Sequence, residues 1–380
     1  MRKDQFITKL DGTINNVADY ITAIDTLVSN NRSDNRIFVF RGEPQKHETY
    51  CTPNIFRKDV LSSNTFYEKS LFNAMRQNKL TNSNSYLENA IDAQHGEFPS
   101  RLLDVSYNCL NALYFAVTPY YHHEEDHLDN KDGMVYVFYI DDIFSPSAEN
   151  TNNNYDAIIN KSEDWFNNQA IFEKNHKFID HSKINNRIIV QQGAFILFQG
   201  NDAESIPTYM MNGIIIPKKS KPKIRQELSL LFGINTGTIY PEIVNLAADI
   251  TNKSKMLVTE KFCWENELKY VLKNFEKELN YYTDYLFLSF GKKTQDPEYL
   301  ESVQMVEMII NSYRIGLIKF DNDFKNSRLC KQDPKLSYKV QPFLDAYNAI
   351  LDDFKKNLFN LCNTKISDEL FIKEQRNELS

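Results

Sequence analysis

Side chains that could do chemistry gather in two short stretches of this sequence. The first is Phe40-Arg41-Gly42, which ends the strand-like run 37–40. The second, residues 94–104, places an amide, an imidazole, a guanidinium and two carboxylates around a glycine and a proline, and an apolar run follows it. Polar groups at the mouths of buried elements are typical of binding and catalytic sites. We therefore expect the functional site at these residues.

Each of these side chains has a possible chemical role and a possible structural one. Arg41 could hold a diphosphate by two parallel hydrogen bonds, or it could pair with Asp104 or Glu43. His95 could act as a general base or contact substrate, or it could hydrogen-bond locally at the end of a helix. Asp104 could carry out chemistry, cap the next helix or orient Arg101. Spacing alone leaves these alternatives open.

Two further candidates lie later in the chain. Gln192 stands beside Gly193 at a turn or bulge, where it could bind a ribose or an amide, or satisfy backbone groups. Glu242 follows Pro241 and could stabilise a developing positive charge on a sugar, as carboxylates do in glycoside chemistry, or could simply be exposed. The run 122–127 contains three histidines and three carboxylates without helical spacing, so we interpret it as a solvated loop and predict no metal site.

Composition limits the classes of protein that fit. The chain has 380 residues, 42% hydrophobic and 25% charged, which is enough for two or three globular domains. Its net charge of −7 gives no general attraction to nucleic acid or to anionic membranes. Glycine is scarce, and the absence of GxGxxG and GxxxxGK[ST] patterns argues against dinucleotide-binding Rossmann and P-loop enzymes.

The cysteines and the apolar segments indicate the compartment. Five widely spaced cysteines without a CxxC pair signal neither a zinc site nor a disulfide framework, and free thiols fit a reducing compartment. The N-terminus is not followed by an apolar signal core, and no run reaches the roughly 20 apolar residues that span a bilayer. We expect a cytoplasmic protein that does not enter membranes.

Periodicity predicts a mixed α and β part followed by a helical part. Predicted helices cover about 14–30, 64–80 and 108–117, with another leading to residues 94–95 and a short one ending at Gly233. Predicted strands cover 37–40, 101–105, 133–140, 187–190, 194–198 and 214–216, and 145–183 is expected to be a loop with a short helix near Trp165. From about residue 255, three apolar stripes with helical spacing follow, which places a domain boundary between 254 and 255. The fold class is α+β with an all-helical C-terminal extension.

At these motifs the sequence resembles the FRG domain family, which is named for a (F/Y)-R-G motif. The matching segments, in chain order, are Phe40-Arg41-Gly42, the block 94–116, the element 187–195, and Gly233-Ile234 with Ile239-Tyr240-Pro241-Glu242. They cover roughly residues 15–250. Four positions depart from the family pattern: Val105 stands where Trp is usual, Ser100 where Thr is usual, Cys109 where Pro is usual, and Glu242 where Asp is usual.

FRG domains are similar to the ADP-ribosyltransferase fold, a mixed sheet core with flanking helices that binds NAD. The resemblance implies an early strand that presents Arg41 to NAD and a middle strand and helix over residues 100–116. The late strand should carry a catalytic Glu, but the alignment on Gly193 puts Arg187 near that position. The catalytic carboxylate would then be displaced, with Glu242 and Asp104 as candidates.

The resemblance therefore implies a set of site residues over domain 1–254. The expected NAD-binding residues are Phe40, Arg41, Gly42, Gln94, Ser100, Arg101, Asn108 and Gln192. The expected catalytic residues are Arg41, His95, Arg101, Asp104 and Glu242. Residues such as Arg41, Ser100, Arg101 and Gln192, far apart in the chain, should converge on one cleft.

The function that follows is NAD-dependent ADP-ribosyl transfer to a macromolecule by a toxin or anti-phage effector. RNA or DNA is favoured over protein as the acceptor, and a cognate antitoxin or regulator is a possible partner. Two alternatives remain: a non-catalytic nucleotide-binding sensor, and a metal-independent nuclease that uses His95 and Arg101. The helical domain 255–380 is expected to contact a partner or the acceptor, not NAD.

Overall fold

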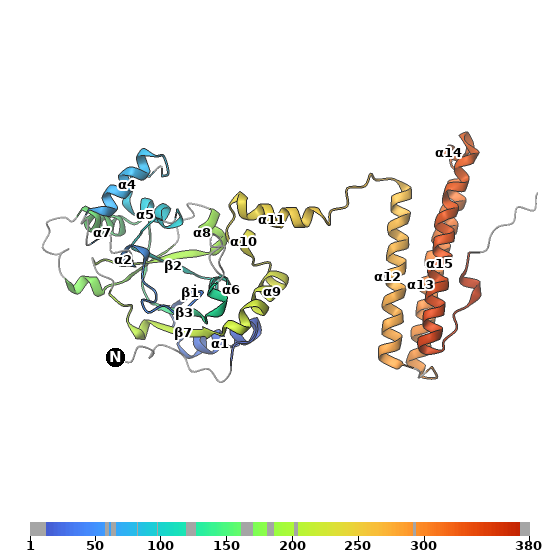
Figure 1. The fold of residues 1–380 in the computed structure, drawn as a ribbon, viewed down its shortest axis with the longest axis horizontal. Helices are drawn as coiled ribbons and strands as arrows, with labels where there is room; N and C mark the ends of the chain where they lie inside the picture. Colours follow the sequence, from blue (N-terminus) through green and yellow to red (C-terminus); the bar gives the residue numbers. More distant parts are fainter. Residues whose placement is uncertain are drawn as a thin grey trace, which may run out of the picture. The chain divides into compact units, whose positions relative to one another are not determined.

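The computed structural model describes residues 13–57, 61, 66–81, 83–96, 98–118, 127–160, 170–180, 186–200, 204–291 and 294–372. The chain divides into two compact units, Met1–Met256 and Leu257–Ser380, close to the boundary predicted at residue 254. The first unit contains a curled sheet with helices around it, and the second is helical (Figure 1).

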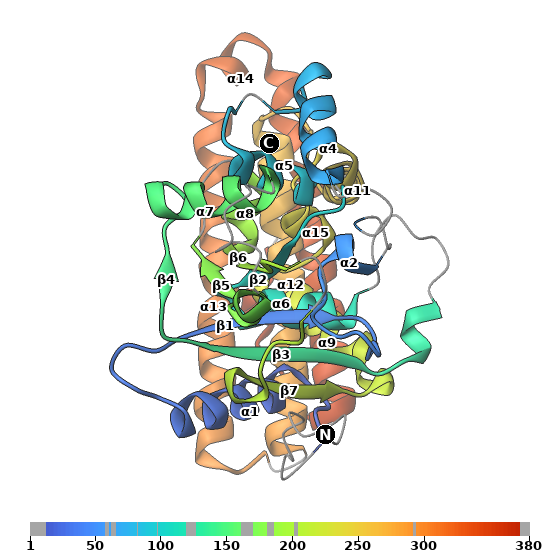
Figure 2. The same ribbon diagram turned by 90° about the vertical axis from the view of Figure 1, so that its left-hand side faces the viewer.

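The sheet of the first unit is mixed, as the sequence predicted, and its seven described strands follow the order β4-β5-β6-β2-β1-β3-β7. The strands are β1 (Ile37–Glu43), β2 (Leu102–Ser106), β3 (Gly133–Ile140), β4 (Ile143–Phe144), β5 (Lys177–Ile179), β6 (Gly193–Leu197) and β7 (Met211–Ile216). Neighbouring strands are antiparallel except β4 and β5, which are parallel. Figure 2 shows β1, β3 and β7 side by side.

The helices of the first unit form two groups on the sheet. The α-helices are α1 (Val17–Asn30), α2 (Asn54–Arg57), α4 (Tyr67–Gln77), α5 (Tyr86–His95), α6 (Cys109–Val117), α7 (Glu149–Asn160), α8 (Asn186–Gln191), α9 (Lys221–Phe232), α10 (Thr236–Ile239) and α11 (Ile243–Ser254). Helices α1, α6 and α9 share an apolar core with β1, β3 and β7. Helices α4, α5, α7 and α8 share another with β2, β5 and β6. The two groups therefore meet where β1 and β2 are neighbours.

Short 3₁₀ helices complete the connections of this unit. They are η1 (His127–Asn130), η2 (Ala170–Lys174), η3 (Thr208–Met210) and η4 (Lys218–Ser220).

No helix among the described residues is long and apolar enough to cross a bilayer.

Two of the predictions from periodicity were wrong. Residues 187–190 belong to helix α8, because only Ile188 of this β-branched run is buried while Ile189 and Val190 face solvent. The expected loop 145–183 contains α7, whose buried residues Thr151, Tyr155 and Ile159 are four apart and form one helical face, and strand β5. The helix expected near Trp165 lies outside the described residues.

Helix α6 packs directly on the backbone of β1 and β3 through glycines. A Cβ atom on Gly42 would overlap the carbonyl oxygen of Ala112 and lie 2.7 Å from the amide nitrogen of Ala116. A Cβ on Gly133 of β3 would overlap the carbonyl oxygen of Ala116. Only glycine fits at these positions, so the glycine of the Phe-Arg-Gly motif is required by packing.

This packing predicts a large effect of Gly42→Ala on stability. The added methyl group meets backbone atoms that cannot rotate away, so we expect unfolding of the first unit to become easier by about 3 kcal/mol. Gly316→Ala is the control, because Gly316 lies inside a helix and a Cβ there meets nothing within 4 Å. That change should stabilise its helix by about 0.5 kcal/mol. Urea denaturation followed by circular dichroism measures both, and equal effects would contradict the packing argument.

The helical unit has its own apolar core. Its elements are α12 (Trp264–Phe290), α13 (Pro297–Lys325), α14 (Arg328–Gln332), η5 (Pro334–Val340), α15 (Gln341–Cys362) and η6 (Asp368–Leu370). The stripes predicted from helical spacing are buried in this core, where the ring of Phe275 stacks on Tyr347 at 4.9 Å between centroids. Residues 364–372, which we call the C-terminal strap, add Ile366 and Leu370 to it.

Candidate functional site

A cleft opens where strands β1 and β2 separate. The register between them contains a single pair, Phe40 opposite Ser106, whereas β1 pairs with β3 along its whole length. The cavity beside this pair has a volume of about 220 Å³. Its lining residues come from β1, β2, α5, α6, α8 and the end of α10: Phe40, Arg41, Gly42, Gln94, Asp104, Val105, Ser106, Phe115, Arg187, Gln191 and Tyr240.

Arg41 spans the separation between the two strands. Its Nη1 donates to the backbone oxygen of Asp104 on β2 at 2.9 Å, and its Nε donates to the carboxylate of Glu43 at 3.1 Å. Glu43 is buried and also lies 3.5 Å from Arg57. Nη2 of Arg41 makes no hydrogen bond to a described residue, and 21% of the side chain is exposed. The guanidinium is thus oriented by the protein and still has donors for a ligand.

The charge of Arg41 is secure at any physiological pH. Burial is the largest influence and would lower the pKa of this guanidinium, but the charges of Glu43 and Asp104, the Cys51 thiol and the hydrogen bond to Glu43 together outweigh it, and the pKa lies above its ordinary value. A permanently charged guanidinium with free donors suits a phosphate or carboxylate group. Burial is also the main influence on His47, and there it lowers the pKa of the imidazole below its ordinary value.

Gln94 and Asp104 form a second polar feature of the cleft. Nε2 of Gln94 donates to Oδ2 of Asp104 at 2.5 Å. The other oxygens of this pair, Oε1 of Gln94 and Oδ1 of Asp104, are buried and have no hydrogen-bond partner among the described residues. Buried acceptors without donors are rare in native proteins and costly. These two oxygens therefore fit a ligand that brings hydroxyl or amide donors.

The opposite wall of the cleft combines aromatic rings with a second guanidinium. Phe115 and Tyr240 contact each other edge to face with centroids 6.1 Å apart, and Arg187 lies over the ring of Tyr240 at 4.7 Å. Arg187 also forms an ion pair with Glu242 at 3.7 Å. Glu242 itself is 44% exposed and stands at the residue before α11, so it lies beside the cleft wall and not among the lining residues.

Residue 191, not 192, is the glutamine of the cleft. Nε2 of Gln191 donates to the backbone oxygen of Ile239 at 3.1 Å, and its own backbone oxygen accepts from Ser106 and Asn111. Gln192 follows the helix with a positive φ of 49° and is not among the residues that line the cavity. Because residues 187–190 belong to a helix and not to the predicted strand, Gln191 is the glutamine that reaches the cleft.

Arg101 and Ser100 belong to the core, contrary to the expectation that they bind NAD. The Arg101 side chain is fully buried, with its Nε 3.0 Å from both carboxylate oxygens of Glu68 and its Nη1 bonded to the backbone oxygens of Phe198 and Gly200. Ser100 is fully buried, and its hydroxyl accepts from the amide of Leu102. These hydrogen bonds use the donors of Arg101 and link α4 to the residues that follow β6.

The other predicted residues divide between the cleft and its supports. Phe40 and Gly42 line the cavity, while Asn108 caps helix α6 through a bond from the amide of Leu110 at 2.9 Å. The prediction for the His95 side chain lies outside what the structure describes. So does the segment 119–126 with most of the histidine-rich run, and the described residues contain no group that could hold a metal ion.

Sequence reasoning missed six of the lining residues: Val105, Ser106, Phe115, Arg187, Gln191 and Tyr240. Arg187 and Tyr240 both stand inside the family motifs, so their positions carried a usable signal. The apolar appearance of Phe115 and Tyr240 concealed their role, because aromatic rings in an apolar run are most simply explained as core.

A comparison with protein families agrees with the motifs. The model of the family described as FRG domain matches residues 36–125, which include β1, β2 and α6. No curated protein and no solved structure matches the chain. The match covers residues 36–125 of the 380, and this part of the chain contributes Arg41, Gln94 and Asp104 to the lining of the cleft.

Substitution of the two motif arginines, Arg41 and Arg101, should lower the free energy of unfolding by different amounts. Arg101→Met leaves Glu68 buried without its partner, so we expect a loss of about 3–5 kcal/mol. Arg41→Met should cost only about 1 kcal/mol, because Arg57 still neutralises Glu43. Thermal and urea unfolding measure the difference. An Arg41 variant as unstable as the Arg101 variant would show that Arg41 is chiefly a structural residue.

Proposed function

We propose that this protein is an NAD-dependent ADP-ribosyltransferase that uses the cleft between β1 and β2. The observation that carries the proposal is the meeting of Arg41, with free donors, and the buried acceptor oxygens of Gln94 and Asp104 in one small cavity. A phosphate on Arg41 and donor groups on the two oxygens together describe a nucleotide with ribose hydroxyls. The FRG domain match at residues 36–125 supports the proposal only through the resemblance of FRG domains to the ADP-ribosyltransferase fold.

The size of the cleft suits one end of a dinucleotide. Whole small-molecule ligands occupy cavities of about 300–1,000 Å³, and this cavity holds about 220 Å³. We assign the nicotinamide ribose to the cavity and the diphosphate to Arg41 at its mouth. Phe115 and Tyr240 supply apolar surface for a planar ring.

The chemistry follows from these positions. The bond between the nicotinamide nitrogen and ribose C1′ breaks, its electron pair leaves with nicotinamide, and positive charge develops on the ribose. Asp104, with its free Oδ1 inside the cleft, accepts a hydrogen bond from a ribose hydroxyl and stabilises this charge. A nucleophile of the acceptor then bonds to C1′ and releases its proton. Glu242 is the weaker candidate because it is exposed and paired with Arg187.

The acceptor that we propose is a nucleic acid, RNA or DNA, with protein as the less favoured choice. A toxin or anti-phage effector, regulated by an antitoxin or another partner, is the biological role that we attach to this activity. A cytoplasmic site of action agrees with the described cysteines, which are all free thiols.

A nucleotide-binding sensor without catalysis is the second candidate. It is favoured by one observation: both candidate carboxylates already have partners, Asp104 with Gln94 and Glu242 with Arg187. A nuclease that uses Arg101 has little support, because that guanidinium is buried and bound to Glu68.

Incubation of the purified protein with NAD labelled in the adenylate part, in the presence of mixed RNA, DNA and protein, tests the proposal. We expect label transfer and nicotinamide release by the wild type, and at least a hundredfold lower rate for Asp104→Asn, because loss of the charge removes the main stabilisation of the ribose cation. Arg41→Lys should also be slowed at least tenfold, since lysine cannot make two parallel hydrogen bonds.

Glu242→Gln is the matched control, since it removes a carboxylate beside the cleft while keeping its shape. It should retain activity within a few-fold of the wild type. Activity that survives Asp104→Asn but is lost in Glu242→Gln would move the catalytic role to Glu242. Tight NAD binding with neither transfer nor nicotinamide release would reject the transferase and support the sensor.

A further inference from the structure

The helical unit contains a groove between α13 and α15. Helix α12 packs against both of them, and the C-terminal strap joins them over part of their length. The strap is tied to α13 by a bond from the amide of Ser367 to Glu307 at 3.1 Å. It is tied to α15 by Asn348, which both donates to and accepts from the backbone of Ile372 at 2.9 Å. A segment of chain that includes the short helix η6 thus already lies against both helices.

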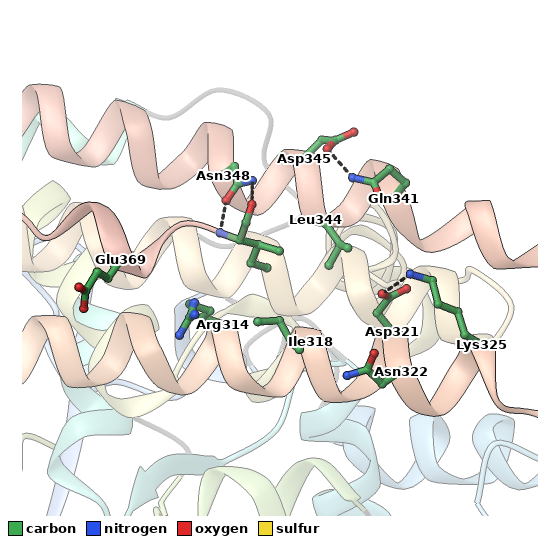
Figure 3. A pocket seen from close by; sticks show the side chains of 11 residues that line it. Arg314, Ile318, Asp321, Asn322, Lys325, Gln341, Leu344, Asp345, Asn348 and Glu369 are labelled. Atoms are coloured by element: carbon green, nitrogen blue, oxygen red, sulfur yellow. Dashed lines mark hydrogen bonds and ion pairs between the residues drawn. The ribbon is translucent and has the colours of Figure 1, made fainter. Parts of the chain in front are cut away.

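Next to the strap, the space between the two helices is an open cavity of about 670 Å³ (Figure 3). It is lined by Arg314, Ile318, Asp321, Asn322, Lys325, Gln341, Leu344, Asp345, Asn348, Glu369 and Ile372. Figure 3 shows Arg314 and Glu369 at one end, Asp321, Lys325 and Asp345 at the other, and Ile318 and Leu344 between them. The groove therefore has polar ends and an apolar middle.

Arg314 is the residue that indicates a ligand, because one of its buried donors has no partner among the described residues. Its Nη1 donates to Asn311 at 3.1 Å, but its Nε is buried without a hydrogen-bond partner. No carboxylate of the described residues forms an ion pair with it, although Glu369 is exposed at the same end of the groove. A buried guanidinium donor without an acceptor is costly, which indicates an acidic group that the described residues of the unit do not supply.

The other end of the groove has the opposite character. Lys325 neutralises Asp321 through a 2.6 Å ion pair, whereas Asp345 accepts only an amide bond from Gln341 at 2.9 Å. One carboxylate therefore keeps an unbalanced negative charge. Arg314 and Asp321 are seven residues apart on α13, so the two ends are about 10 Å apart. Three residues of extended chain span this distance.

We propose that this groove binds an extended peptide segment of a partner protein. An acidic side chain of the segment binds Arg314, an apolar one contacts Ile318 and Leu344, and a basic one about three positions from the acidic one binds Asp345. The strap is the internal precedent, because the same helix pair holds its main chain through Asn348. The proposal stands independently of the activity assigned to the first unit.

Fluorescence anisotropy with the full-length protein and the labelled peptide acetyl-SELAKS-amide tests this. We expect saturable binding, about tenfold weaker for Arg314→Gln and for Asp345→Asn. The peptide acetyl-SKLAKS-amide, without the acidic residue, should bind weakly and with the same affinity to the wild type and to Arg314→Gln. The peptide acetyl-SELAES-amide, without the basic residue, should likewise be insensitive to Asp345→Asn.

Lys331→Gln is the control, because Lys331 lies outside the groove lining and has the same change of charge as Arg314→Gln. Circular dichroism melting of each variant shows that the helices remain folded, and Arg314→Lys should keep part of the binding. The proposal is overturned if no peptide binds, or if acetyl-SELAKS-amide binds the wild type and Arg314→Gln with the same affinity. A change of oligomeric state in Arg314→Gln, seen by light scattering, would overturn it in favour of a second copy of the chain.

Discussion

The contact between helix α6 and strand β1 determines the geometry of the first unit. At Gly42 the helix backbone at Ala112 and Ala116 lies against the strand with no side chain between them. The helix follows directly from β2, so its position also fixes where β2 lies relative to β1. Both family motifs meet in this contact, because one contributes the glycine and the other the alanines. The close approach leaves room beside Phe40 and Ser106 for the strands to separate, and the cleft begins there.

Two buried glutamates explain why two arginines of similar sequence context have different roles. Glu68 holds Arg101 in the core, where its donors are used by protein groups alone. Glu43 shares its charge between Arg41 and Arg57, so part of the Arg41 guanidinium remains free at the cleft. Buried ion pairs of this kind are costly to break, because the remaining charge has no solvent. The cleft arginine is therefore positioned by a buried charge and is not dependent on the ligand for its orientation.

The helical unit is stabilised by different contacts from those of the first unit. Its stability comes from long apolar stripes and stacked rings, such as Phe275 on Tyr347, and the strap completes the core with Ile366 and Leu370. Its groove borders this core, because Leu344 belongs to both, and lies between two helices that the strap holds together. We therefore assign the proposed recognition of a partner to the groove of this unit and the proposed chemistry to the cleft of the first unit.

The sequence alone determined the elements with strong apolar patterns and the position of the FRG-like motifs. The helix over 14–30 and the three C-terminal stripes could be predicted because one face of each is buried at regular spacing. The strand over 133–140 could be predicted because it is a continuous apolar run that is buried along its whole length. The motifs around Arg41 and Asp104 also located two walls of the cleft. Tertiary structure decided the rest. Residues 187–190 look like a strand, but only Ile188 meets the core, so they form a helix that brings Arg187 and Gln191 to the cleft. Arg101 could not be separated from Arg41 by sequence, because the difference lies in Glu68, a partner 33 residues away that only the fold places beside it.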